Sequence, residues 1–223
     1  MIQKYDIIGF QKVQNKITEP MTKFGGQPIW IDKAQWPISI GWENRKMMFV
    51  GQIYIDKNMF EFEKDFMAYI FVTHPKDSMD TFFDPDVTEW DGGENAVILQ
   101  TFENVHIPDM EVEEGPCIFD EKNMRYEYIP ILRQGYDPEF LTREEFCSLE
   151  IDQQDKYFTA IDSSKIGGTP NFFRGDAWPI GEWKLLLQLK CNFLPFELRL
   201  GGMPIMYVFI EKNLKKAGLL VQN

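Results

Sequence analysis

Short apolar runs, bounded by polar or turn-forming residues, are the main pattern along this chain. Runs of about five residues with this pattern are typical of buried β-strands. They lie at residues 47–53, 68–72, 96–100, 184–189, 206–210 and 218–222. Three runs fall in each half of the chain, in the same order, with insertions confined to polar stretches. The pattern therefore predicts a β-rich protein with mainly antiparallel strands.

Helical patterns are fewer than strand patterns. Thr142 and Glu145 match the Thr-x-x-Glu capping box, which predicts a helix that begins there and continues to Leu149. Residues 152–161 form a second predicted helix, and residues 211–217 are expected to form a short polar helix before the last strand. Strands and helices in this order place the chain in the α+β class, with strands dominant.

One motif occurs twice, with its two copies 142 positions apart. Each copy contains Lys-x-Gly-Gly-x-Pro, an aromatic residue two positions after the proline, and a later Trp-Pro-Ile. The apolar run that follows each motif ends in a glutamine and another apolar residue. The first copy contributes Lys23, Gly25, Gly26, Trp30, Trp36 and Gln52, and the second contributes Lys165, Gly167, Gly168, Phe172, Trp178 and Gln188. Agreement at so many positions indicates an internal duplication.

The residue types of the motif predict local structure. The paired glycines allow a tight turn with positive φ, and the proline prevents helix formation. Because the residue before a proline is extended, the motif is predicted to be a turn that enters a strand. Gln52 and Gln188 are expected to bond backbone groups, since a buried amide needs partners. Lys23 and Lys165 are candidates to neutralise a bound carboxylate, and the alternative for both is a salt bridge at the turn.

The duplication divides the chain into three parts. Residues 1–110 form the first repeat copy, residues 111–162 a linker with a helix, and residues 163–223 the second repeat copy. Two such units are expected to pack as one globular body about a pseudo-twofold axis, by the self-complementarity that also governs homodimers.

Charge narrows the classes of partner. Acidic residues outnumber Lys and Arg by 35 to 23, which gives a net charge of −12. Nucleic acids and anionic membranes are therefore disfavoured as partners, and a basic protein is favoured. Three cysteines without metal-binding spacing, no signal-like N-terminus and no apolar run of ~18 residues predict a cytoplasmic protein.

The doubled Lys-x-Gly-Gly-x-Pro with Trp-Pro resembles the YwqG-like family of uncharacterised bacterial proteins. The resemblance covers residues 20–110 and 160–223. It extends distantly to programmed cell death protein 2, although this chain lacks the zinc-binding cysteines of that protein. The resemblance implies a binding module of a chaperone-like or immunity type. This sequence departs from the family at residues 200–203, where Leu-Gly-Gly-Met stands in place of Trp-Gly-Asp.

Candidate catalytic and metal-binding residues are sparse. The only histidines are His74 and His106, and neither lies in a local nucleophile or metal pattern. The acidic stretch at residues 84–94 begins like an EF-hand loop, but its sixth position is Glu89 instead of glycine. A solvated insertion between strands is favoured there. No cofactor and no metal are expected.

The leading functional hypothesis is a non-enzymatic module that binds a protein or peptide in a groove between the two copies. The candidate binding residues are the twelve motif residues named above, because aromatic-rimmed turns could be presented by both copies. The alternative is a small hydrolase-like enzyme that uses acidic residues and a histidine in the same groove. A third hypothesis is a structural subunit of a larger assembly.

Overall fold

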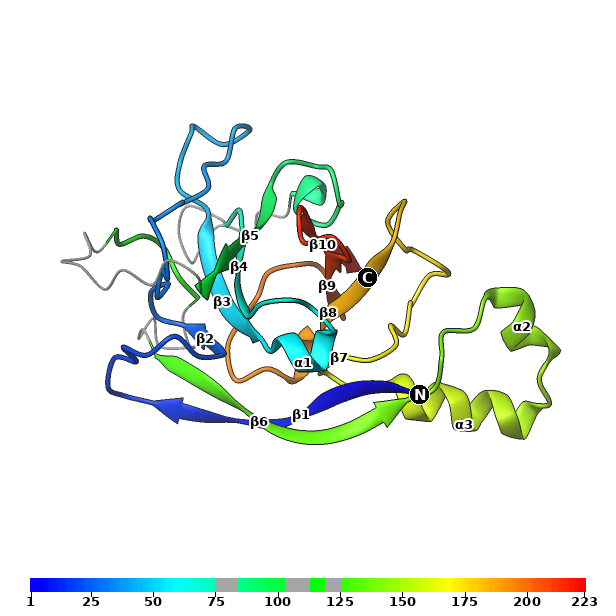
Figure 1. Cartoon of the computed structure of the whole chain (residues 1–223). Coiled ribbons are helices and arrows are strands. Elements are labelled where there is room, and N and C mark those ends of the chain that lie inside the picture. Colours follow the sequence, from blue (N-terminus) through cyan, green and yellow to red (C-terminus); the bar gives the residue numbers. More distant parts are fainter. Residues whose placement is uncertain (75–83, 103–112, 119–125) are drawn as a thin grey trace.

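The computed structural model describes residues 1–74, 84–102, 113–118 and 126–223 (Figure 1). These residues form ten strands and a few short helices. The strands are β1 (Ile2–Val13), β2 (Lys23–Gly25), β3 (Met48–Ile55), β4 (Phe66–Val72), β5 (Asn95–Thr101), β6 (Glu127–Asp137), β7 (Lys165–Gly167), β8 (Trp183–Lys190), β9 (Ile205–Glu211) and β10 (Ala217–Gln222). The six strands that the apolar runs predict are confirmed as β3, β4, β5, β8, β9 and β10.

All ten strands belong to one sheet, in the order β10-β9-β8-β7-β1-β6-β2-β3-β4-β5. Every neighbouring pair is antiparallel, as expected from the sequence. The sheet curves into a nearly closed barrel, so that its end strands β10 and β5 approach each other. The backbone N–H of Val221 on β10 donates to the carbonyl of Thr88, just before β5, at 2.9 Å. The fold is thus a β-rich, barrel-like sheet.

The two longest strands, β1 and β6, lie at the centre of the sheet and pair with each other over almost their whole length. Figure 1 shows them as a long ribbon along one side of the molecule. Strand β1 precedes β2 in the chain but pairs with β7, whereas β6 precedes β7 but pairs with β2. Each half of the chain therefore contributes one long strand that pairs with a short strand of the other half: β1 pairs with β7, and β6 pairs with β2. The sequence patterns above miss both strands, and β6 lies within the range expected as a linker.

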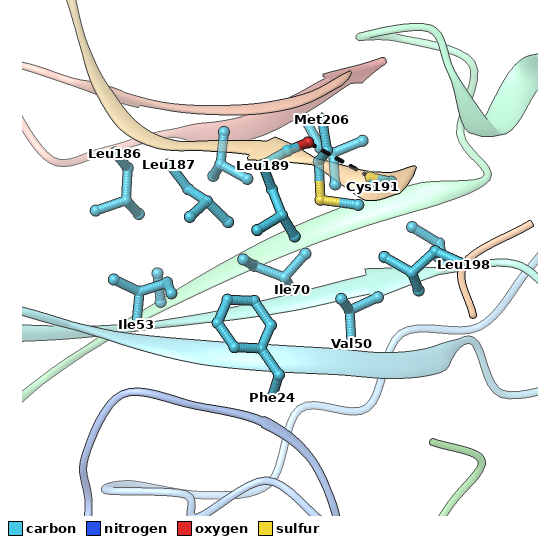
Figure 2. Packing of buried hydrophobic residues seen from close by; sticks show 14 of the residues in the cluster. Phe24, Val50, Ile53, Ile70, Leu186, Leu187, Leu189, Cys191, Leu198 and Met206 are labelled. Atoms are coloured by element: carbon cyan, nitrogen blue, oxygen red, sulfur yellow. Dashed lines mark hydrogen bonds between the residues drawn. The ribbon is translucent and has the colours of Figure 1, made fainter. Parts of the chain in front are cut away.

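The inside of the barrel is a continuous hydrophobic core formed by both halves of the chain. Figure 2 shows Phe24, Val50 and Ile53 from the first half facing Leu187 and Leu189 from the second. Most of these side chains are fully buried. Close packing of apolar side chains occupies the space between the halves, which is where the sequence suggests a binding groove.

Two smaller clusters cover the outside of the barrel. The segment after each Gly-Gly turn crosses the outer face of its own half and places aromatic residues on β4 or β9. The expectation that this turn enters a strand is wrong, because β2 and β7 end at the turn and the following segment forms no strand. The backbone N–H groups of this segment donate to side chains, described below, and not to the carbonyls of a neighbouring strand.

Helices lie mainly at one end of the sheet. The two predicted helices are confirmed as α2 (Arg143–Ser148), with a capping box between Thr142 and Glu145, and α3 (Ile151–Ile161). They project to one side of the strands (Figure 1). Shorter elements are α1 (Lys57–Phe60), η1 (Pro85–Val87) and η3 (Cys191–Phe193).

The predicted polar helix at residues 211–217 is wrong. A hairpin turn joins β9 and β10 there, with the N–H of Glu211 donating to the carbonyl of Lys216 at 2.9 Å and Leu214 at a φ of 60°. The pairing of the two flanking strands overrides the local helical preference. No helix among the described residues is long and apolar enough to cross a membrane.

Candidate functional site

The two motif glutamines hold the covering segments against the barrel. The side-chain oxygen of Gln52 accepts from the N–H of Ile29 at 2.9 Å, and that of Gln188 accepts from the N–H of Asn171 at 2.7 Å. Both amide groups also donate to backbone carbonyls, including that of Met21 in the first half. The interpretation that these glutamines bond backbone groups is confirmed, and both side chains are buried.

A second pair of glutamines makes matching contacts. Gln100 accepts from the N–H groups of Ile31 and Asp32, and Gln222 accepts from those of Phe173 and Arg174. Each N–H donor in the first half lies 142 residues before its counterpart in the second half, which is the spacing between the two motifs. The sequence signal was present, because each glutamine ends the last apolar run of its half.

Both motif lysines are completely buried in ion pairs. The Nζ atom of Lys23 lies 2.7 Å from Oε1 of Glu127 on β6, and that of Lys165 lies 2.6 Å from Oδ2 of Asp137 at the other end of β6. Burial lowers the pKa of both lysines, to about 8 for Lys165, although the neighbouring carboxylates oppose this shift. These contacts match the salt-bridge alternative for the two lysines.

Residues of β1 extend the ion pairs of the second half. The Nζ atom of Lys4 lies 2.8 Å from Oδ1 of Asp137 and 3.0 Å from Asp6, whose carboxylate also accepts from the hydroxyl of Ser163 at 2.6 Å. Burial alone would lower the pKa of Lys4, but its hydrogen bonds to Asp137 and Asp6 raise it. Sequence reasoning missed this network because its members lie far apart along the chain.

The second glycine of each pair is required by these carboxylates. Gly26 and Gly168 have φ angles of 66° and 78°, where side chains are disfavoured. A Cβ atom at Gly26 would collide with the Glu127 carboxylate, and one at Gly168 would collide with that of Asp137. The first glycines, Gly25 and Gly167, also have positive φ.

The aromatic candidates pack on the outer face of the sheet. Trp30 and Trp36 are buried against Phe71, with ring centroids 6.0 and 5.4 Å from it. Phe172 and Trp178 occupy the corresponding places beside Phe209 but are only partly buried. Of the twelve candidate binding residues, Gly26 borders one described cavity, of about 190 Å³, and Phe172 borders a second.

The second cavity, of about 420 Å³, is the larger of the two and lies between the α2–α3 hairpin and residues 170–176. We call it the hairpin cavity. Its volume is within the range of pockets that bind small ligands or peptide side chains. Aromatic rings form much of its lining, namely those of Phe140, Phe146, Tyr157, Phe158 and Phe172. The motif predicts only the last of these rings.

Ring contacts hold the wall of the hairpin cavity in place. Phe146 of α2 packs on Tyr157 of α3 at 5.9 Å, and Phe140 packs on Phe172 at the same distance. The hydroxyl of Tyr157 donates to the carbonyl of Glu139 and accepts from the N–H of Leu141. Burial raises the pKa of this tyrosine, which therefore stays neutral at physiological pH. The hairpin is thus anchored at its base by a tyrosine that presents its ring to the cavity.

Three exposed charged side chains border the hairpin cavity: Arg143, Arg174 and Asp176. None of them forms an ion pair with another residue in the part of the chain that the structure describes. Two guanidinium groups with no carboxylate partner among the described residues stand out in a chain with a net charge of −12.

The acidic stretch at residues 84–94 has a buried carboxylate at each end, whereas its other three acidic side chains are exposed. Asp84 caps η1 and accepts from the indole N–H of Trp42, while Glu94 accepts from the hydroxyls of Ser39 and Thr73. Among the described residues, no group of three or more His, Cys, Asp or Glu side chains could hold a metal ion.

The histidine candidates of the hydrolase alternative are only partly described. Burial, aided by Arg45, lowers the pKa of His74 to about 4. Its Nδ1 atom is buried without a hydrogen-bond partner in the described structure, so no nucleophile is paired with it there. His106 lies outside the described residues.

Comparisons with known proteins reach the family level. A comparison with curated proteins finds no relative of the chain. A family whose description is "Domain of unknown function (DUF1963)" matches residues 22–217, which is most of the chain and includes both copies of the motif. The chain therefore belongs to the DUF1963 family.

Proposed function

We propose that this protein is a non-enzymatic module that binds a protein or peptide partner, and that its binding site is the hairpin cavity. The observation that carries the proposal is a cavity of about 420 Å³ with an aromatic lining and two arginines at its edge, neither paired with a carboxylate of the described residues. Binding sites typically combine apolar walls with a few polar groups that orient the ligand. The closed core between the two halves supports this location over a central groove.

Aromatic residues and arginine are enriched in protein–protein interfaces relative to the rest of the protein surface. The wall of the hairpin cavity contains both. Phe158 of α3 is half exposed, at 49%, although it lies beside the buried Ile161. A half-exposed ring in the cavity wall is available to contact a partner.

We infer further that the chain is an internal duplication, with two copies related by a pseudo-twofold axis. The matching glutamine contacts support this, as does the strand order, which places corresponding strands at equal distances from the central β1–β6 pair. The copies differ after the central strands. Residues 138–164 contain α2 and α3, whereas only nine residues separate β1 from β2. The hairpin cavity would then be a feature of the second copy alone.

The finer likeness to YwqG-like proteins and to programmed cell death protein 2 rests on the sequence motif.

A peptide library displayed on phage and selected against the purified protein tests the proposal. We expect enriched peptides that bind with dissociation constants in the micromolar range, as is common for peptide-binding modules. Phe158→Ala should weaken their binding about tenfold or more, because it removes a ring from the cavity wall. The matched control is Ile151→Ala, which removes an exposed apolar side chain from the same helix but outside the cavity.

Equal binding to the wild-type protein and to both variants would place the peptides elsewhere and contradict the site. The absence of any enriched peptide that binds below about 1 mM, an order-of-magnitude threshold for specific recognition, would contradict the function itself.

A further inference from the structure

The polar groups that remain available in the hairpin cavity restrict the chemistry of its ligand. The Tyr157 hydroxyl is engaged with backbone groups, and the side-chain amide of Asn171 donates to Asp162 at 3.0 Å. The N–H groups of Phe173 and Arg174 are bonded to Gln222. Among the side chains of the lining, the aromatic rings and the three charged groups at the edge are therefore the main groups available to a ligand.

The three charged side chains that border the cavity favour an anionic ligand. Arg143 and Arg174 contribute two positive charges and Asp176 contributes one negative charge, so that the edge carries one excess positive charge. A singly charged carboxylate balances it, whereas a doubly charged phosphate would leave a surplus negative charge in an already acidic protein. Arginine is also well suited to carboxylates, because its planar guanidinium can donate two parallel hydrogen bonds.

We infer that the hairpin cavity recognises the C-terminal residue of a peptide, with its apolar side chain against the aromatic wall and its carboxylate at Arg143 and Arg174. This inference rests on the proposed function and names the ligand class of the same site. A C-terminal residue carries an apolar side chain and a carboxylate on one Cα atom. An internal Asp or Glu lacks the adjacent apolar group and continues the chain on both sides. The C-terminal residue is therefore the part of a protein that matches apolar walls with an anion site at the edge.

The experiment uses hexapeptide libraries in two forms, one with a free carboxyl terminus and one with an amidated terminus, and measures binding by fluorescence anisotropy. We expect the best free-acid peptides to end in an apolar residue and to bind about tenfold or more tightly than their amides, because a charge-assisted hydrogen bond is lost. Arg174→Gln and Arg143→Gln should each remove most of this difference. The matched control is Lys156→Gln, which removes a positive charge from α3 outside the cavity.

Two outcomes separate this inference from the proposed function. If acids and amides bind equally, with Phe158→Ala still weakening both, carboxylate recognition is wrong and peptide binding stands. If neither library binds, both are wrong. Competition with small anions provides a further arm, in which phenylacetate should displace the peptide more effectively than phenyl phosphate. The reverse order would show a phosphate site and overturn the inference.

Discussion

Lys165 and Asp137 form an ion pair of 2.6 Å in which both side chains have no exposed surface. Asp137 is the last residue of β6, and Lys165 is the first residue of β7, so the pair spans the helical insertion between them. The same carboxylate accepts from the backbone N–H of Thr169, immediately after the Gly-Gly turn. One carboxylate thus joins the central ribbon, the motif lysine and the turn.

Replacement of Asp137 by alanine should destabilise the protein by about 3–5 kcal/mol, because Lys165 and Lys4 would lose the carboxylate that both contact in a buried site. Urea denaturation followed by circular dichroism measures this loss. The matched control is Lys212→Ala, which breaks an exposed pair with Glu182 at 3.3 Å and should change stability by less than about 1 kcal/mol. Similar losses in both variants would show that burial of the first pair is unimportant.

Gln52→Leu and Gln188→Leu should each destabilise the fold by about 1–3 kcal/mol, since each leaves a buried backbone N–H without an acceptor. The covering segment should also loosen, which hydrogen exchange at Ile29 or Asn171 would detect. Gln134→Leu, on the exposed part of β6, is the control and should have little effect on stability. Unchanged exchange in the two buried variants would contradict the anchoring role of the glutamines.

Alanine at Gly26 or Gly168 should destabilise the protein by more than the ~1–2 kcal/mol that positive φ alone costs, because the added Cβ atom collides with a carboxylate. Gly93→Ala separates the two effects. Gly93 has a φ of 81°, but apart from its chain neighbours no atom of the described residues lies within 4 Å of the position that an added methyl group would occupy. Thermal unfolding of the three variants should therefore rank Gly93→Ala as the mildest.

His74 should make stability depend on pH. Burial lowers the pKa of the folded-state imidazole to about 4, below the ordinary value of 6.5. Between pH 4 and 6.5 the unfolded chain therefore binds more protons at this residue, and the free energy of unfolding increases with pH. Stability should fall as the pH is lowered through this window. His74→Gln should reduce that slope, and an identical slope in the variant would contradict the assignment.

The exchanged central strands predict that the two halves depend on each other. Fragments 1–118 and 119–223 should each be unfolded alone, because β2 loses its partner β6 and β7 loses its partner β1. Co-expression should restore the fold through the β1–β6 ribbon and the shared core. Cooperative unfolding of either fragment alone, measured by calorimetry, would show that the halves are independent domains.

Local sequence patterns were sufficient for several elements of the fold. Apolar runs predict six strands, the Thr142–Glu145 capping box predicts α2, and the expected burial of Gln52 and Gln188 predicts their backbone contacts. The strands and the helix depend on residues close together in the chain, where turn chemistry and apolar periodicity act directly. The glutamine contacts follow from the need of a buried amide for hydrogen-bond partners.

The sequence by itself determined six of the buried strands, the two Gly-Gly turns and that the chain carries one motif twice. Only the tertiary structure decided that β1 and β6 cross between the halves, that Lys23 meets Glu127 across 104 positions, and that α2 and α3 enclose a cavity beside Phe172. Such contacts depend on how strands far apart in the chain align, and local propensity contains no information about that alignment. The motif lysines, which the sequence offers as binding residues, are therefore buried partners in ion pairs. The open cavity is lined mostly by residues outside the motif.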